Sequence, residues 1–223
     1  MGRPREHDES TREALLRAAE QQLSRGEPLS VRGVADAVGT TTRAVYSLFG
    51  SMDGLHQALI ARGFDELRRR VEAQPTTDDP AADLVRVGAT AFRGFATEHP
   101  NLFRLGFERM IPGLAPAPEV EPVQRAALKA LLDRVVRCRD ARLLGSHAAR
   151  DVTWQFHAFC QGLASVELLG WFPGGEEPER LWRQALSAFV AGLAADLPRA
   201  RAPRGQRANK RSTSGSGRSG ASR

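Results

Sequence analysis

Hydrogen-bond donors are concentrated in one short segment near the start of this 223-residue chain. The segment carries six polar side chains within eight positions: Thr40, Thr41, Thr42, Arg43, Tyr46 and Ser47. Hydroxyl and guanidinium groups donate to phosphate oxygens and to base edges in a DNA groove. A helix N-cap would account for only one of the three threonines. The segment therefore predicts contact with double-stranded DNA.

Patterns that would indicate catalysis or metal binding are weak elsewhere. Asp53 and His56 have the i, i+3 spacing of a metal-ligand pair on a helix, but a solvated helix face is the favoured interpretation. Glu98 and His99 precede Pro100, where a surface or capping role is favoured over catalysis. The sequence lacks the paired Glu-x-x-His motifs of a di-iron bundle, the Gly-x-Ser-x-Gly elbow and the P-loop. We therefore expect no enzyme activity, no cofactor and no bound metal.

The composition is that of an ordinary globular protein, with 41% hydrophobic and 26% charged residues. No apolar run approaches the roughly 18 residues of a membrane span, and the N-terminus lacks the apolar region of a secretory signal. Cys138 and Cys160, the two cysteines, are too few for a disulfide framework. We interpret them as small buried hydrophobes in a reducing compartment, which predicts a cytoplasmic protein without a membrane partner.

The net charge of +6 is unevenly distributed along the chain. Residues 198–223 hold eight basic residues and no acid, so residues 1–197 sum to −2. This Arg/Ser/Gly-rich tail is predicted to be disordered, either simply solvated or attracting DNA without sequence preference. Residues 1–55 have a net charge of −1. DNA binding there requires the acids to face away from the groove, namely Glu6, Asp8, Glu9, Glu13 and Glu20.

Helical periodicity recurs from residue 10 to residue 197, and no alternating run of β-branched or aromatic residues predicts a sheet. The predicted helices cover approximately residues 10–24, 31–38, 41–49, 51–71, 79–98, 100–107, 123–142, 147–172 and 177–197. Residues 108–122, with four prolines, are predicted to form a loop. The sequence thus predicts an all-α fold of about nine helices.

The helices at 31–38 and 41–49 are too short to be stable alone, so they must pack on the first helix. Ser30 can cap the first of the pair, and a tight turn at Gly39 separates the two. Two short helices joined in this way indicate a helix-turn-helix unit, whose second helix enters the major groove.

The stretch LSVRGVADAVGTTTRAVYSLFGS (29–51) and the leucine at position 55 resemble the TetR-type (tetracycline-repressor-like) regulators. The GRPR opening (2–5) resembles the basic arm that often precedes their DNA-binding domain. The resemblance implies a helix-turn-helix domain at 1–55, a helical ligand-binding and dimerisation domain at 56–197, and the tail at 198–223. Met52 departs from the family, whose members often have a phosphate-binding lysine there. The expected DNA-binding residues are Arg3, Arg5, Ser30, Arg32, Thr40, Thr41, Thr42, Arg43, Tyr46 and Ser47.

Segments 99–107 and 162–168 resemble one branch of the family's C-terminal domains. That branch has a Trp and a His-Gly signature, which appears here as His157 and Gln161-Gly162, so no effector contact is carried over from it. Large rings recur on successive helices of this region, either as ordinary core or as the wall of a cavity. Residues expected at such a pocket are Phe92, Phe95, Phe103, Phe107, Met110, Trp154, His157, Cys160 and Gln161. Acids are sparse among them, so we expect an apolar or aromatic small-molecule effector.

A homodimer is expected to form through the last two helices. The expected interface residues are Leu163, Val166, Leu169, Leu186, Phe189, Val190 and Leu193, and small residues such as Gly162 and Gly192 permit close helix approach. Those two glycines equally suit packing within one chain. A two-fold pair would set the reading helices about one DNA turn apart, roughly 34–36 Å. The function predicted is a repressor released from its operator by the effector. The alternative is a helical-bundle ligand-binding protein or enzyme that no longer binds DNA.

Overall fold

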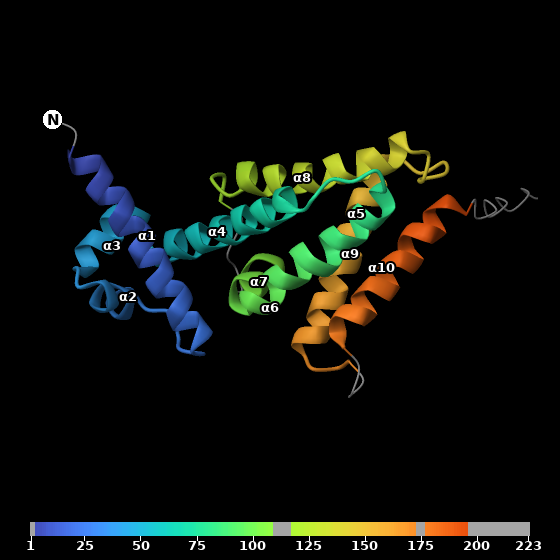
Figure 1. Cartoon of the computed structure of the whole chain (residues 1–223). Helices are drawn as coiled ribbons and strands as arrows, with labels where there is room; N and C mark the ends of the chain where they lie inside the picture. Colours follow the sequence, from blue (N-terminus) through green and yellow to red (C-terminus); the bar gives the residue numbers. More distant parts are fainter. Residues whose placement is uncertain (1–2, 109–116, 173–176, 196–223) are drawn as a thin grey trace, which may run out of the picture.

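The computed structural model describes residues 3–108, 117–172 and 177–195, with side chains from Glu9 onward (Figure 1). The helices are α1 (Arg3–Ser24), α2 (Val31–Val38), α3 (Thr42–Phe49), α4 (Met52–Ala73), α5 (Pro80–Arg86), η1 (Val87–Phe92), α6 (Arg93–Glu98), α7 (Pro100–Phe107), α8 (Glu121–Asp140), α9 (Ala149–Leu168) and α10 (Pro178–Ala194). The consecutive segments α5, η1 and α6 form one rod. This part of the chain therefore has nine helices and no strand, which confirms the predicted all-α fold.

The N-terminal unit consists of α1, α2 and α3, which pack through buried side chains such as Leu15, Ala19, Val34 and Val45. The chain reverses between α2 and α3 at Gly39, whose φ of 71° favours glycine. The N–H of this glycine also bonds the last carbonyls of α2. Short helices with capped ends and a shared core thus form one packed unit.

The C-terminal domain is built around α4, which runs from the N-terminal unit alongside α8 (Figure 1). The α5–η1–α6 rod, α9 and α10 complete the domain (Figure 1). α7 packs against the middle of α4, near Gly63 and Phe64, and also contacts α1. None of the described helices combines the length and the apolar character required to cross a lipid bilayer.

Two helices differ from the predicted ones. The first begins at Arg3 instead of near residue 10. The helix predicted at 79–98 contains a π-helical segment, η1, in its middle. At the start of η1, a Cβ on Gly88 would lie 2.5 Å from Leu186 Cδ1 and 3.0 Å from Phe156 Cζ. Close packing of α9 and α10 against η1 is thus a tertiary feature, which helical periodicity alone does not encode.

A buried carboxylate joins the start of α5 to α8. Asp83 is 1% exposed and pairs with Arg86 at 2.9 Å and with Arg137 at 2.6 Å. It also accepts hydrogen bonds from the backbone N–H and the hydroxyl of Thr77. Burial opposes the charged form, but the bonds from Thr77 and the two arginines outweigh it and hold the pKa of Asp83 well below its usual range.

Candidate functional site

The outward face of α3 carries a row of exposed polar side chains. Thr42, Arg43, Tyr46 and Ser47 are all exposed, with Tyr46 at 51%, whereas Val45 on the opposite face is buried. This arrangement follows from the helical repeat, because positions i, i+3 and i+4 share a face. The exposed donors are therefore available to a groove, while the apolar face holds the helix on α1.

The other expected DNA-binding residues fall into three groups. Ser30 and Thr41 are N-caps, since their hydroxyls accept the N–H of Gly33 at 3.1 Å and of Ala44 at 3.2 Å. Arg32 is exposed and 3.7 Å from Asp36, and Thr40 is half-buried beside the turn. The side chains of Arg3 and Arg5 lie outside the described part of the chain.

Acids of α1 are engaged by the C-terminal domain. Arg62 of α4 contacts Glu13 at 2.6 Å and Glu20 at 3.3 Å, and His99 Nδ1 lies 2.5 Å from Glu20 Oε1. Asn101 Nδ2 donates to the carbonyl of Leu23 at the end of α1, at 2.8 Å. Glu13 and Glu20, two of the five acids expected to face away from DNA, are thus directed toward α4 and α7. The same contacts connect α1 to both helices.

A cavity of about 430 Å³ lies between α4, η1, α7, α8 and α9. Five of the residues expected at a pocket line it: Phe92, Phe107, Trp154, His157 and Gln161. The rings meet one another around it, with centroid separations of 5.8 Å for Phe92 and Phe107 and 5.6 Å for Phe107 and His157. Six of its seventeen lining residues are thus aromatic, and six more are aliphatic.

Two of the polar residues that line this cavity belong to α9. Burial lowers the pKa of His157, so its imidazole is neutral at pH 7. Its ring packs against Phe92 and Trp154, with centroids 5.8 and 5.9 Å away. Gln161 Nε2 donates to the carbonyl of Phe107 at 3.1 Å, which joins α9 to the end of α7. A neutral imidazole can both donate and accept a hydrogen bond to an uncharged ligand.

Three residues expected at the pocket do not line it. Phe95 and Phe103 are fully buried core residues, and Phe103 stacks behind the cavity-lining Phe107 at 5.2 Å. Cys160 is fully buried beside Gly88, and this burial raises the pKa of its thiol. The helical face of each residue depends on which neighbour its helix packs against, which local spacing does not reveal. Met110 lies outside the described residues.

The cavity is also lined by residues that the sequence did not predict. Phe64 and Leu67 come from α4, and Glu121, Gln124 and Arg125 come from the first turns of α8. Glu121 and Arg125 form an exposed ion pair at 2.6 Å. No local signal identifies them, because their contribution depends on how α4 and α8 pack together.

The expected dimer face is partly buried within the single chain. Leu186, Val190 and Leu193 point into the core, so they are unavailable to a partner. Of the remaining expected residues, Leu169 is 55% exposed, and Leu163, Val166 and Phe189 are half-buried. α10 packs Leu186, Val190 and Leu193 against the α5–η1 rod, so these three residues do not belong to the expected dimer interface.

The two glycines of the expected interface face open space. A Cβ on Gly162 of α9 or on Gly192 of α10 would meet nothing within 4 Å, and Ala158 and Ala188 beside them are exposed. Packing within one chain is therefore not their role. The outer face of α9 and α10 presents small residues flanked by partly exposed apolar ones.

The pair at the start of α4 lacks further metal ligands. His56 Nδ1 lies 3.9 Å from Asp53 Oδ1, and burial lowers the pKa of His56. No group of three or more His, Cys, Asp or Glu side chains suited to a metal converges in the described chain. The side chain of His56 is 14% exposed and its Nδ1 is buried without a hydrogen bond in the described chain, so the expected solvated helix face is wrong for His56.

Comparison with known proteins identifies a family for the C-terminal domain. Residues 85–189 match the family model described as the tetracyclin repressor-like C-terminal domain. A search of curated proteins found no match. Among solved structures, a protein of unknown function from Rhodococcus sp. RHA1 has a TM-score of 0.72 at 24% identity, over 83% of this chain and 96% of that one.

Two structural neighbours have names that state a role. NalD, the secondary repressor of the MexAB-OprM multidrug efflux pump in Pseudomonas aeruginosa, has a TM-score of 0.59 at 22% identity, over 86% of this chain and 100% of that one. The TetR family transcriptional regulator PfmR from Thermus thermophilus has a TM-score of 0.58 at 16% identity, over 80% and 97%. At these identities the likeness establishes the fold.

Proposed function

The chain belongs to the TetR family of transcriptional regulators through its C-terminal domain and its fold, and from this premise we propose that it is a homodimeric repressor released from operator DNA by a small apolar or aromatic molecule. The proposal divides the chain into a reading domain at residues 1–55 and an effector and dimerisation domain at 56–197.

The exposed face of α3 is the observation that carries this proposal. Arg43 is its one long cationic donor, and Tyr46 and Ser47 lie one turn further along the helix. Arginine can bond both acceptors of a guanine edge, while tyrosine and serine hydroxyls suit phosphate oxygens. Because bulk charge does not favour DNA at 1–55, specific contacts from this face must supply the affinity.

The effector is proposed to bind in the aromatic cavity. Rings from η1, α7 and α9 favour a planar apolar ligand, and neutral His157 favours one that is uncharged and carries a hydrogen-bonding group. The cavity volume of about 430 Å³ is within the usual range for small-molecule sites.

Two connections can transmit ligand binding to the reading domain. Phe64 and Leu67 line the cavity from α4, whose Arg62 contacts Glu13 of α1. Phe107 lines it from α7, whose Asn101 holds the end of α1. A ligand releases DNA through these helices if it binds more tightly to the chain in its non-DNA conformation.

The dimer is proposed to form through the outer face of α9 and α10. An arginine at Gly162 or Gly192 would place a charged, bulky side chain in the centre of that face. Light scattering at micromolar concentration is expected to report a dimer for the unaltered chain and a monomer for Gly192→Arg. A monomeric unaltered chain would contradict this part of the proposal.

DNA binding tests the function directly. Fluorescence anisotropy with the DNA upstream of the chain's own gene is expected to detect binding that a scrambled duplex does not compete away. The rival, a ligand-binding protein or enzyme that no longer binds DNA, predicts no difference between the two duplexes. Adding aromatic compounds to the bound complex then tests release.

A further inference from the structure

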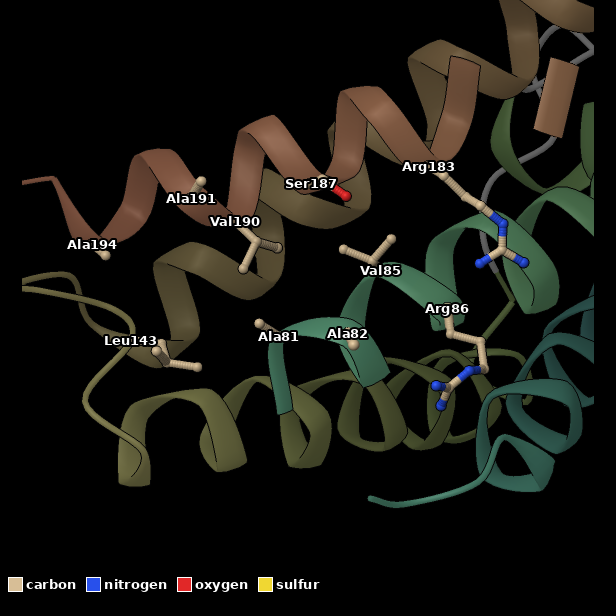
Figure 2. Close-up of a pocket in the computed structure, with 10 residues that line it drawn as sticks. All are labelled: Ala81, Ala82, Val85, Arg86, Leu143, Arg183, Ser187, Val190, Ala191 and Ala194. Atoms are coloured by element: carbon tan, nitrogen blue, oxygen red, sulfur yellow. The ribbon is translucent and has the colours of Figure 1, made fainter. Parts of the chain in front are cut away.

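A second hollow lies on the outside of the C-terminal domain, between α5 and α10 (Figure 2). Its volume is about 460 Å³. Small aliphatic side chains form most of its wall: Ala81, Ala82, Val85, Val190, Ala191 and Ala194. Unlike the aromatic cavity, this groove has no ring in its wall.

The groove results from side-chain size along two packed helices. At Gly88, α10 approaches the α5–η1 rod so closely that a Cβ would lie 2.5 Å from Leu186 Cδ1. Before that point, alanines of α5 face alanines of α10, and these side chains are too short to fill the space between the backbones. The groove is therefore lined by short side chains, next to the point where Leu186 packs onto Gly88.

The two ends of the groove differ in charge. Arg86 and Arg183 lie at one end, and Leu143 and Ala194 lie at the other (Figure 2). Ser187 and Val190 stand between these ends on α10. The hollow is thus amphipathic along its length.

The arginine end has excess positive charge. Asp83 is shared between Arg86 and Arg137, and Arg183 pairs with Glu179 at 2.7 Å. Three guanidinium groups therefore face two carboxylates, which leaves a net charge of +1. Arg183 donates from Nε and Nη2 to one oxygen of Glu179. Its Nη1 makes no hydrogen bond within the described chain, so it can donate to an incoming anion.

We propose that this groove binds an aliphatic carboxylate, with the carboxylate at Arg86 and Arg183 and the hydrocarbon chain along the alanine-lined wall. A single negative charge matches the net +1, and the absence of rings favours a flexible aliphatic chain over a planar one. The α10 segment from Arg183 to Ala194 spans roughly 16 Å at 1.5 Å per residue. An extended chain of about 8 to 12 carbons fits within that length.

The groove is separate from the face proposed for the dimer. At 3.6 residues per turn, Arg183, Ser187 and Ala194 lie roughly 140° around α10 from Ala188 and Gly192, and Ala191 lies roughly 80° from them. A second copy seated on the dimer face therefore leaves the groove accessible, so the carboxylate, not a partner chain, is its occupant.

Calorimetric titration of the full chain with dodecanoate, below its micelle concentration, tests the proposal. Dodecanoate is expected to bind, whereas dodecylammonium, with the same chain and the opposite charge, is not. Arg183→Gln is expected to weaken binding about tenfold, because a charge-assisted hydrogen bond is lost. Lys129→Gln removes an equal, exposed charge on α8, outside the groove, and is expected to leave the affinity unchanged.

Filling the groove provides a second variant. Ala191→Phe at an exposed position of α10 is expected to abolish dodecanoate binding while the far-ultraviolet circular dichroism and unfolding temperature stay those of the unaltered chain. Three results would overturn the proposal: no binding of dodecanoate at millimolar concentration, equal affinity for dodecylammonium, or binding that persists in both variants. Displacement by 2-naphthol, a probe of the aromatic cavity, would place the ligand there and also overturn it.

Discussion

The exposed polar face of α3, proposed to bind DNA, and the aromatic cavity, proposed to bind the effector, hold their side chains in opposite ways. Arg43 and Tyr46 project into solvent from a helix whose other face is buried. Phe92 is itself core, and His157 packs among rings. Binding and stability are therefore separable on α3, whereas in the effector domain a change to the ligand wall also changes the packing.

This difference bears on how each region can vary. A substitution on the α3 face is expected to alter the proposed contacts to DNA and to leave the free energy of unfolding nearly unchanged. A substitution in the cavity wall removes apolar contacts that hold α7, α9 and η1 together. Four substitutions test the comparison, beginning with one that affects folding alone.

Asp83→Asn is expected to have the largest effect, because it leaves two arginines facing no anion. Loss of one partner from a buried ion pair destabilises by about 3–5 kcal/mol. Urea unfolding measures this loss of free energy. The matched control is Asp133→Asn, which is expected to cost little because its exposed carboxylate pairs with Lys129 at 2.7 Å. An equal loss of unfolding free energy in Asp133→Asn would contradict the explanation that burial makes the Asp83 ion pair important.

The same carboxylate predicts a pH dependence. The pKa of Asp83 is lower in the folded chain than in the unfolded one, so its contribution is fully present above the unfolded value of about 4. As the pH falls from there toward the folded pKa, the contribution is lost. Unfolding free energies measured from pH 6 to pH 3 are expected to fall more steeply for the unaltered chain than for Asp83→Asn. Parallel curves would contradict the assignment.

Phe107→Ala is expected to affect both ligand response and folding. The ring is half-buried, so the cost should be about 2–3 kcal/mol, below the value for a fully buried phenylalanine. DNA binding is expected to persist while release by aromatic compounds is blunted. Leu168→Ala, half-buried against the core on α9 and outside the cavity wall, is the control that should lose stability and keep the response. Full inducibility of Phe107→Ala would move the effector site elsewhere.

Arg43→Ala is expected to affect DNA alone. Loss of a bidentate base contact should weaken operator binding by about 1–3 kcal/mol and leave the unfolding midpoint unchanged. Anisotropy and thermal unfolding of the same preparation measure the two quantities. Arg139→Ala, an exposed arginine at the end of α8, controls for loss of charge. Unchanged operator affinity in the folded Arg43→Ala variant would remove α3 from the reading role.

Asn101→Ala is expected to have the smallest effect, on communication between the regions. It removes one hydrogen bond, worth about 1 kcal/mol, between α7 and the end of α1. The ligand-induced change in operator affinity is expected to shrink, by roughly 0.5–2 kcal/mol of coupling. Thr97→Ala, whose hydroxyl bonds only carbonyls of its own helix, is the control. Identical release curves for both variants would exclude the Asn101 hydrogen bond as a connection and leave the contacts of Arg62 and His99 with α1.

Local sequence rules predicted the reading unit well. Capping residues, a glycine turn and two short amphipathic faces give the bounds of α2 and α3, because short-range hydrogen bonds and side-chain periodicity decide them. The first helix was placed wrongly at its start, since polar N-terminal residues carry no apolar periodicity.

In the effector domain, the sequence by itself determined the helices and their approximate ends. It also identified five of the cavity-lining residues, because large apolar rings must be buried somewhere. Only the tertiary structure decided which rings face the cavity and which are core, which α10 leucines turn inward, and which α8 residues complete the wall. Periodicity fixes the face of a helix relative to itself, whereas the partner of that face is set by long-range packing such as the contact of Leu186 with Gly88.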